Sequence, residues 1–250
     1  MSKLIRQRNM KKYLFLIVLW ASCFKLFAQD YNASLFGCKS DGVTNNMGSI
    51  QYAIDYIAKK GGGKLHFYVG RYLTGTFSLK SNVSIELHEG AVLVGSSNIF
   101  DYSLQDGKRA LIVAVGQSNI QIGGKGVIDG QQSLLRSQVA ALRQKGNIDL
   151  SEKVEDISLI YLKASRNIQI NGIMELNLLG AAQFIDQCAD VTLSALDINS
   201  PGSIGVYVSN SKTVRLSNVF FQAIGKALVE SEGSQQVIKE NSRLANGKTL

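Results

Sequence analysis

Short runs of alternating apolar and polar residues recur along the second half of the chain at a constant spacing. The clearest run starts at residues 167, 190, 213 and 236, so successive copies lie 23 residues apart. Written beneath one another, the copies align apolar residues in three columns: Ile168, Val191, Val214 and Val237; Ile170, Leu193 and Leu216; and Ile173, Leu196 and Val219. A fixed period of this kind indicates a structural repeat.

A period of 23 residues fits a coil of three short strands, in which equivalent side chains stack on those of the neighbouring coils. We therefore predict an all-β chain, a parallel β-helix over residues 64–250. These 187 residues hold about eight periods, hence about eight coils. Leucine-rich repeats have similar periods, but they need Leu at several fixed positions and a column of Asn, and neither is present.

The two ends and the middle of the predicted β-helix depart from the repeat. Residues 48–60 have apolar side chains at helical spacing and precede three glycines, which predicts a capping helix within an N-terminal cap of residues 29–63. Residues 131–156 break the period, and we expect them to loop out of the coil. Lys239 and Ser242 replace apolar residues in the last coil, which suggests a frayed or truncated C-terminal end.

Residues 1–28 have the composition of a secretory signal peptide. They hold six Lys or Arg and no acid, followed by an apolar run of about a dozen residues, which is short for a membrane-spanning helix. We expect an exported protein, periplasmic or extracellular, with no membrane segment after cleavage. A retained anchor or a lipidated Cys23 is the less favoured alternative. Cys38 and Cys188 then remain, and burial as small apolar residues is preferred over a disulfide.

The net charge of +8 depends largely on this leader. Without its six cations the chain has 21 basic and 19 acidic residues, about +2, and these are scattered singly through the polar positions of the repeats. A nucleic-acid-binding protein needs Lys and Arg gathered on one face. The composition therefore gives no support to nucleic acid as a partner.

Several segments of the chain resemble one enzyme family. Residues 36–44 (FGCKSDGVT) resemble its opening Phe-Gly-Ala-Lys-x-Asp-Gly, and residues 61–76, 79–83, 95–102 and 124–130 resemble its glycine-rich first coils, although Tyr68 stands where Pro is usual. The family is glycoside hydrolase family 28, the polygalacturonases, and the resemblance covers about residues 35–235. It implies a right-handed parallel β-helix of the pectin lyase type, no cofactor, and a pectin-like, galacturonate-containing polysaccharide as partner.

The resemblance also implies a mechanism, inverting hydrolysis by three Asp residues acting as general acid and bases. Carboxyl groups in an inverting enzyme stand about 6.5–9.5 Å apart, leaving room for a water molecule. In this chain the matching positions hold Ile204, Gly225 and Lys226, and no Asp-Asp pair occurs anywhere. Ile and Gly can neither donate a proton nor activate water. We therefore expect no catalytic residues and no family-type hydrolysis.

Three residues are candidates for binding substrate: Tyr207, Lys226 and Glu230. By the period, Phe184, Tyr207 and Glu230 share one column, so Tyr207 is either a platform for a sugar ring or an ordinary member of a stack. Lys226 is either a partner for a uronate carboxylate or a plain surface lysine. A second column holds Asp186, Ser209 and Glu232, more typical of a solvated face than of a relocated acid pair.

Three other features have plain structural interpretations. His66 and His88 lie close to one coil apart, but no carboxylate or Cys column accompanies them, so we predict no metal site. Residues 123–126 (GGKG) precede no helical pattern and are predicted to be turn glycines. Asp129 is expected to accept hydrogen bonds from turn amides.

Overall fold

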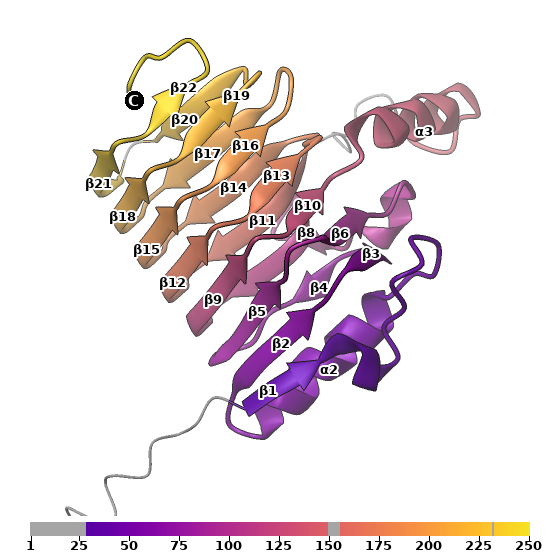
Figure 1. Cartoon of the computed structure of the whole chain (residues 1–250). Coiled ribbons are helices and arrows are strands. Elements are labelled where there is room, and N and C mark those ends of the chain that lie inside the picture. The colour runs from indigo at the N-terminus through magenta and orange to yellow at the C-terminus, as the bar shows by residue number, and fades with distance from the viewer. Residues whose placement is uncertain (1–28, 150–155, 232) are drawn as a thin grey trace, which may run out of the picture.

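The computed structural model describes residues 29–149, 156–231 and 233–250. The chain winds into a right-handed parallel β-helix with three parallel sheets (Figure 1), as the sequence predicts. Sheet 1 has the order β1 (Gln29–Asn32), β2 (Gly63–Phe67), β5 (Val83–Leu87), β9 (Ser118–Gly124), β12 (Arg166–Asn171), β15 (Ala189–Ser194), β18 (Lys212–Ser217) and β21 (Gln235–Glu240).

The other two sheets complete each coil. Sheet 2 has the order β3 (Gly70–Thr74), β6 (Ala91–Gly95), β10 (Val127–Asp129), β13 (Met174–Leu176), β16 (Asp197–Asn199), β19 (Phe220–Gln222) and β22 (Arg243–Leu244). Sheet 3 has the order β4 (Phe77–Ser78), β8 (Lys108–Val115), β11 (Ile157–Lys163), β14 (Ala181–Asp186), β17 (Ile204–Ser209) and β20 (Lys226–Glu230), and β7 (Leu104–Gln105) pairs with β8 as a hairpin.

Side chains one period apart stand in line inside the coil, which confirms the predicted columns. Ile168 pairs with Val191, Val191 with Val214, and Val214 with Val237. Ile168, Val191 and Val214 are fully buried, and burial of each such side chain contributes about 1.5–3 kcal/mol to the stability of the fold. Stacking of apolar side chains on apolar side chains therefore holds successive coils together.

A residue with left-handed backbone lies at the start of most strands of sheet 1, or just before it. Asn82, Asn119 and Asn167 have φ values of 64°, 57° and 53°, a conformation that Asn tolerates better than most residues. Their side chains form a ladder: the amide of Asn167 donates to Asn119 at 2.7 Å, and that of Asn119 donates to Asn82 at 2.8 Å. The turn needs the same backbone in every coil, which is why polar residues recur at this point of the repeat.

The N-terminal end of the β-helix is covered by α2 (Met47–Lys59), which confirms the predicted helix to within one residue at each end. Its inward face, Ile50, Ala53, Ile54 and Ile57, is fully buried and joins the main core. The 3-10 helix η1 (Ala33–Phe36) and strand β1 complete this end (Figure 1), where β1 pairs with the outer edge of β2. The sheet edge that would otherwise be open is thereby paired.

The segment predicted to loop out contains a helix instead, α3 (Gln132–Gln144). Leu135 and Val139 are one helical turn apart, and both are buried against the β-helix. The helix projects from the side of the coil (Figure 1) and packs beside η2 (Ile99–Asp101), where the Gln138 side chain accepts a 2.7 Å bond from the Ile99 amide. Loss of the strand period was read correctly from the sequence, but the helical spacing inside it was missed.

Seven strands of sheet 1 follow residue 62 in the described chain, consistent with the predicted number of about eight coils. The insertion containing α3 takes up residues that the prediction assigned to coils. At the far end the last coil does form: β21 and β22 pair with the coil before them. Lys239 and Glu230 make a 2.5 Å ion pair there.

No helix among the described residues is long and apolar enough to cross a membrane.

Candidate functional site

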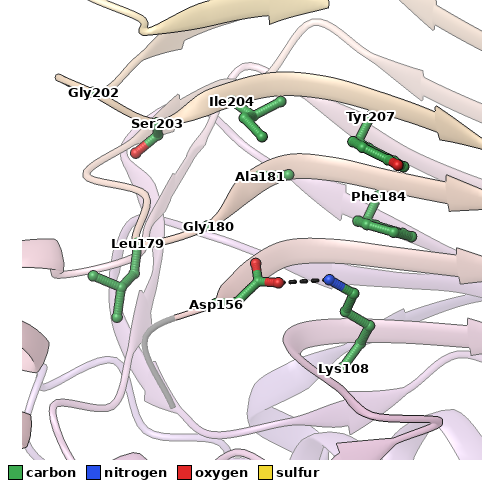
Figure 2. A pocket seen from close by; sticks show the side chains of 10 residues that line it. All are labelled: Lys108, Asp156, Leu179, Gly180, Ala181, Phe184, Gly202, Ser203, Ile204 and Tyr207. Atoms are coloured by element: carbon green, nitrogen blue, oxygen red, sulfur yellow. Dashed lines mark hydrogen bonds and ion pairs between the residues drawn. The ribbon is translucent and has the colours of Figure 1, made fainter. Parts of the chain in front are cut away.

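A groove of about 690 Å³ runs over the outer face of sheet 3. Side chains from the starts of β14 and β17 line it (Figure 2), together with the turns that precede these strands and with Lys108 and Asp156. The strands place Phe184 and Tyr207 outward because alternate residues of a strand face opposite sides of a sheet. The site is thus built on the rigid wall of the coil.

Phe184 and Tyr207 form an aromatic stack along the groove. The two residues are register partners on β14 and β17, and their ring centroids lie 4.5 Å apart at an angle of 10°. Tyr161, on β11, meets Phe184 edge-on at 5.7 Å. The predicted stacking of Phe184 and Tyr207 is confirmed, and it leaves one face of Tyr207 turned away from Phe184.

Lys108 and Asp156 form an ion pair at the near end of the stack (Figure 2). The Lys108 Nζ lies 2.5 Å from Asp156 Oδ2 and 4.5 Å from the centre of the Phe184 ring. Lys108 begins β8 at the β7–β8 hairpin, and Asp156 immediately precedes β11. Neither residue lies in the run of predicted 23-residue columns, so their meeting in the groove could not be predicted from the spacing.

The other side of the groove is fixed by a serine pair. Ser203 Oγ donates to the Leu178 carbonyl at 2.8 Å and lies 3.2 Å from Ser200 Oγ, and both serines are buried. The Gln132 side chain, at the start of α3, donates to Ser203 Oγ at 3.2 Å. These bonds join the insertion to the turn before β17 and hold that turn in place. Neither Ser203 nor Gln132 was among the site residues predicted from the sequence.

The three positions that the family resemblance matches to catalytic Asp residues lie on neighbouring coils. Ile204 lines the groove, and its register partner on the next strand is Lys226. Gly225 and Lys226 are exposed and line an adjoining hollow of about 480 Å³ at the C-terminal end of the coil. Among the described residues lining the groove, the only carboxylate is that of Asp156.

Glu230 lies in a different column from the one predicted. The partner of Tyr207 on β20 is Val229, while Glu230 pairs with Val208. The reason is that the step from β17 to β20 is 22 residues, since Ile204 pairs with Lys226, instead of the 23 of earlier coils. A shift of one residue moves a side chain to the other face of a strand. Glu230 is therefore the register partner of the buried Val208 instead of Tyr207; its own side chain is exposed and bonds to Lys239.

The remaining sequence predictions have mixed outcomes. Asp186 pairs with Ser209 as predicted, whereas Glu232 and the leader of residues 1–28 lie outside the described residues. Asp129 accepts a 3.1 Å bond from the Gln131 amide, which confirms its role in the turn. Cys38 and Cys188 are free thiols, both buried, and burial raises the pKa of each to about 11.

His66 and His88 meet on the outer face of the first coils. Their Nδ1 and Nε2 atoms lie 2.8 Å apart, and His66 Nε2 lies 3.0 Å from Asp30 Oδ1. The ring of Tyr68 stacks on His88 with centroids 4.4 Å apart. The side chains are thus bonded to one another, and no group of three or more His, Cys, Asp or Glu in the described parts of the chain could hold a metal ion.

Comparison with known proteins agrees with this architecture. A solved structure from Parabacteroides merdae, provisionally named a glycosyl hydrolase, is 38% identical with a TM-score of 0.83, and the match covers 88% of this chain and 99% of that one. The family 28 exopolygalacturonase of Yersinia enterocolitica is 26% identical with a TM-score of 0.69, over 78% of this chain and 44% of that one.

A relative found by sequence similarity is also a galacturonate enzyme by name. The exo-poly-alpha-D-galacturonosidase of Dickeya chrysanthemi is 35% identical over 116 residues, which is 40% of this chain and 19% of that enzyme. The chain thus spans less than half the length of either named galacturonate enzyme. Residues 64–248, nearly the whole of the coiled region, match the family described as Glycosyl hydrolases family 28. With its fold and most of its length accounted for by this match, the chain belongs to glycosyl hydrolase family 28.

Proposed function

We propose that the protein binds a pectin-like, galacturonate-containing polysaccharide in the groove of sheet 3 and does not hydrolyse it by the mechanism of its family. The observation that carries the proposal is the pairing of Ile204 with Lys226, two positions that the family resemblance matches to catalytic carboxyl groups. An isoleucine and a lysine cannot supply the acid and the base of an inverting hydrolysis.

The one carboxylate among the described residues of the groove does not replace them. Inversion needs one carboxyl to protonate the leaving oxygen and a second, on the opposite face of the sugar, to activate water. The described lining of the groove offers Asp156 alone, and its Oδ2 is engaged by Lys108 at 2.5 Å. One carboxylate cannot fill both roles in the same step, so the geometry supports binding without turnover.

Several features support an acidic polysaccharide as the ligand. The groove lies on a rigid sheet, it holds an aromatic stack, and it contains an ammonium group. Aromatic rings suit the C–H faces of sugars, and an ammonium group bonds well to carboxylates. The names of the Dickeya and Yersinia relatives refer to galacturonate polymers, so a galacturonate chain is the first ligand to try.

The test measures binding and hydrolysis on the same sample of purified protein. We expect polygalacturonate to bind by calorimetry, while the release of reducing ends stays at the level of the buffer. The Yersinia relative serves as the active control, and a neutral galactan serves as the control for charge. Release of reducing ends at a rate near that of the control enzyme would refute the proposed loss of hydrolysis. Absence of binding would refute the proposal that galacturonate polymers are the ligand.

We also propose that the protein is exported. The basic start and apolar run of residues 1–28 support this proposal. Fractionation of cells expressing the full chain, followed by N-terminal sequencing, tests it. A cytoplasmic protein that retains Met1 would contradict it.

A further inference from the structure

The groove holds a cation and an anion of its own, already bonded to each other. Among the described residues that line the groove, Lys108 is the only cation and Asp156 the only anion. Lys108 lies over the Phe184 ring at 4.5 Å, so the ring fixes where the ammonium group sits. A uronate entering the groove meets this ammonium group next to the aromatic stack (Figure 2).

The Asp156 carboxylate lies between the Lys108 ammonium group and the Gly180 backbone. One of its oxygens bonds to Lys108 at 2.5 Å. The other lies against the Gly180 backbone: a Cβ built on Gly180 would lie 2.7 Å from Asp156 Oδ1 and 2.9 Å from the Ile157 carbonyl oxygen, so the carboxylate and the backbone both exclude a side chain there. Glycine at this position therefore leaves room for a carboxylate group beside Lys108. The room suits any carboxylate of that size, whether it belongs to the protein or to a ligand.

We propose that Lys108 is the receptor for a uronate carboxylate, and that Asp156 occupies this position until the ligand displaces it. The inference rests on the proposed function and deepens it by naming the binding group and its internal competitor. Displacement is feasible because the side chains of Lys108 and Asp156 are 29% and 49% exposed. Exposed ion pairs are worth only about 0.2–1 kcal/mol, a factor of roughly 1.4 to 5 in binding.

The chain also provides a matched control. Lys163 and Asp106 form a second ion pair on the same side of the coil, with Nζ 2.9 Å from Oδ2 and similar exposed fractions of 25% and 53%. Neither residue lines the groove. Neutralising Asp106 therefore changes the protein's charge by the same amount as neutralising Asp156, without opening the position beside Lys108.

The experiment titrates the full chain and its variants with a galacturonate oligomer of fixed length and with its methyl-esterified form. Asp156→Asn is expected to raise affinity for the acidic oligomer by about two- to fivefold. Asp106→Asn is expected to change it by less. Lys108→Gln is expected to lower it at least about tenfold, because a charge-assisted hydrogen bond is lost. The esterified oligomer, which has no free carboxylate, should bind all variants alike.

The outcomes separate this inference from the function on which it rests. If the wild-type chain binds the acidic oligomer but Asp156→Asn binds it no more tightly, or Lys108→Gln binds it equally well, the assignment of Lys108 and Asp156 is overturned and the proposed function stands. If neither oligomer binds to any variant, both are overturned. Circular dichroism of each variant excludes a change of fold as the cause.

Discussion

Replacement of Glu175 by glutamine is expected to flatten the pH dependence of stability between about pH 4.5 and 8. Glu175 lies on β13 in a core column between Ile128 and Ile198, and it is fully buried. The Gln183 amide nitrogen lies 2.6 and 2.5 Å from its two carboxyl oxygens. Burial raises the pKa of Glu175 from 4.5 to about 8, and the bond from Gln183 offsets only part of this effect. The carboxyl group is therefore protonated at neutral pH in the folded protein.

The sign and size of the effect follow from linkage. Between pH 4.5 and 8 the unfolded chain loses the proton of Glu175 while the folded chain keeps it, so a rise in pH favours unfolding. Each pH unit removes about 1.4 kcal/mol from the free energy of unfolding, or about 5 kcal/mol over the whole window. The stability is fully present below pH 4.5 and is lost as the pH rises to about 8. Glutamine has the same shape, can pair with the Gln183 amide, and does not titrate.

Urea unfolding followed by circular dichroism at a series of pH values measures the effect. The advantage of Glu175→Gln over the wild type is expected to grow steadily with pH and to level off above pH 8. Glu89→Gln, which removes an exposed carboxylate from a turn, is the control and should follow the wild type. Parallel curves for wild type and Glu175→Gln across the window would show that Glu175 titrates normally and that this reasoning is wrong.

Three further outcomes are expected. Gly205→Ala should lower the free energy of unfolding by about 3 kcal/mol, seen as a lower Tm, because the new Cβ would lie 2.4 Å from the Ala227 carbonyl oxygen and from a ring carbon of Phe221. The control Gly48→Ala, with open space around it, should raise the free energy of unfolding by about 0.5 kcal/mol. Equal melting temperatures would contradict this. Iodoacetamide at pH 8 should leave Cys38 and Cys188 unmodified in the folded protein, by mass spectrometry, and should modify both in urea, because burial raises the pKa of each thiol. Tyr207→Ala should weaken polygalacturonate binding about fivefold, while Tyr207→Phe should retain most of the affinity. An alanine variant that binds as well as the wild type would show that the aromatic stack does not contribute to binding.

The predicted columns were accurate wherever the chain repeats without interruption. Ile168, Val191 and Val214 were placed in one column from spacing alone, and the structure pairs them so. The reason is that a parallel coil repeats the same backbone hydrogen bonds, so equal spacing means equal position. The predicted column is wrong at Glu230, because the step from β17 to β20 is 22 residues and the prediction assumed 23.

The groove was predicted only in part for a similar reason. Tyr207 and Ile204 belong to the repeat, and the sequence predicted that Tyr207 stacks on Phe184 and that Ile204 lies one coil before Lys226, as the structure has them. Lys108 and Asp156 come from a hairpin and from the residue after an insertion, and no spacing rule relates them. Their meeting in the groove depends on how those segments pack against sheet 3.

The sequence by itself determined the coil, its columns, its helical cap and the absence of paired catalytic carboxylates at the family's positions, because these depend on residue identity and on a constant spacing. Only the tertiary structure decided which charged groups enter the groove and that Glu175 is sealed in the core beside Gln183. Insertions and one-residue changes of step set these contacts, and their geometry follows from packing in three dimensions, which a repeat length does not specify.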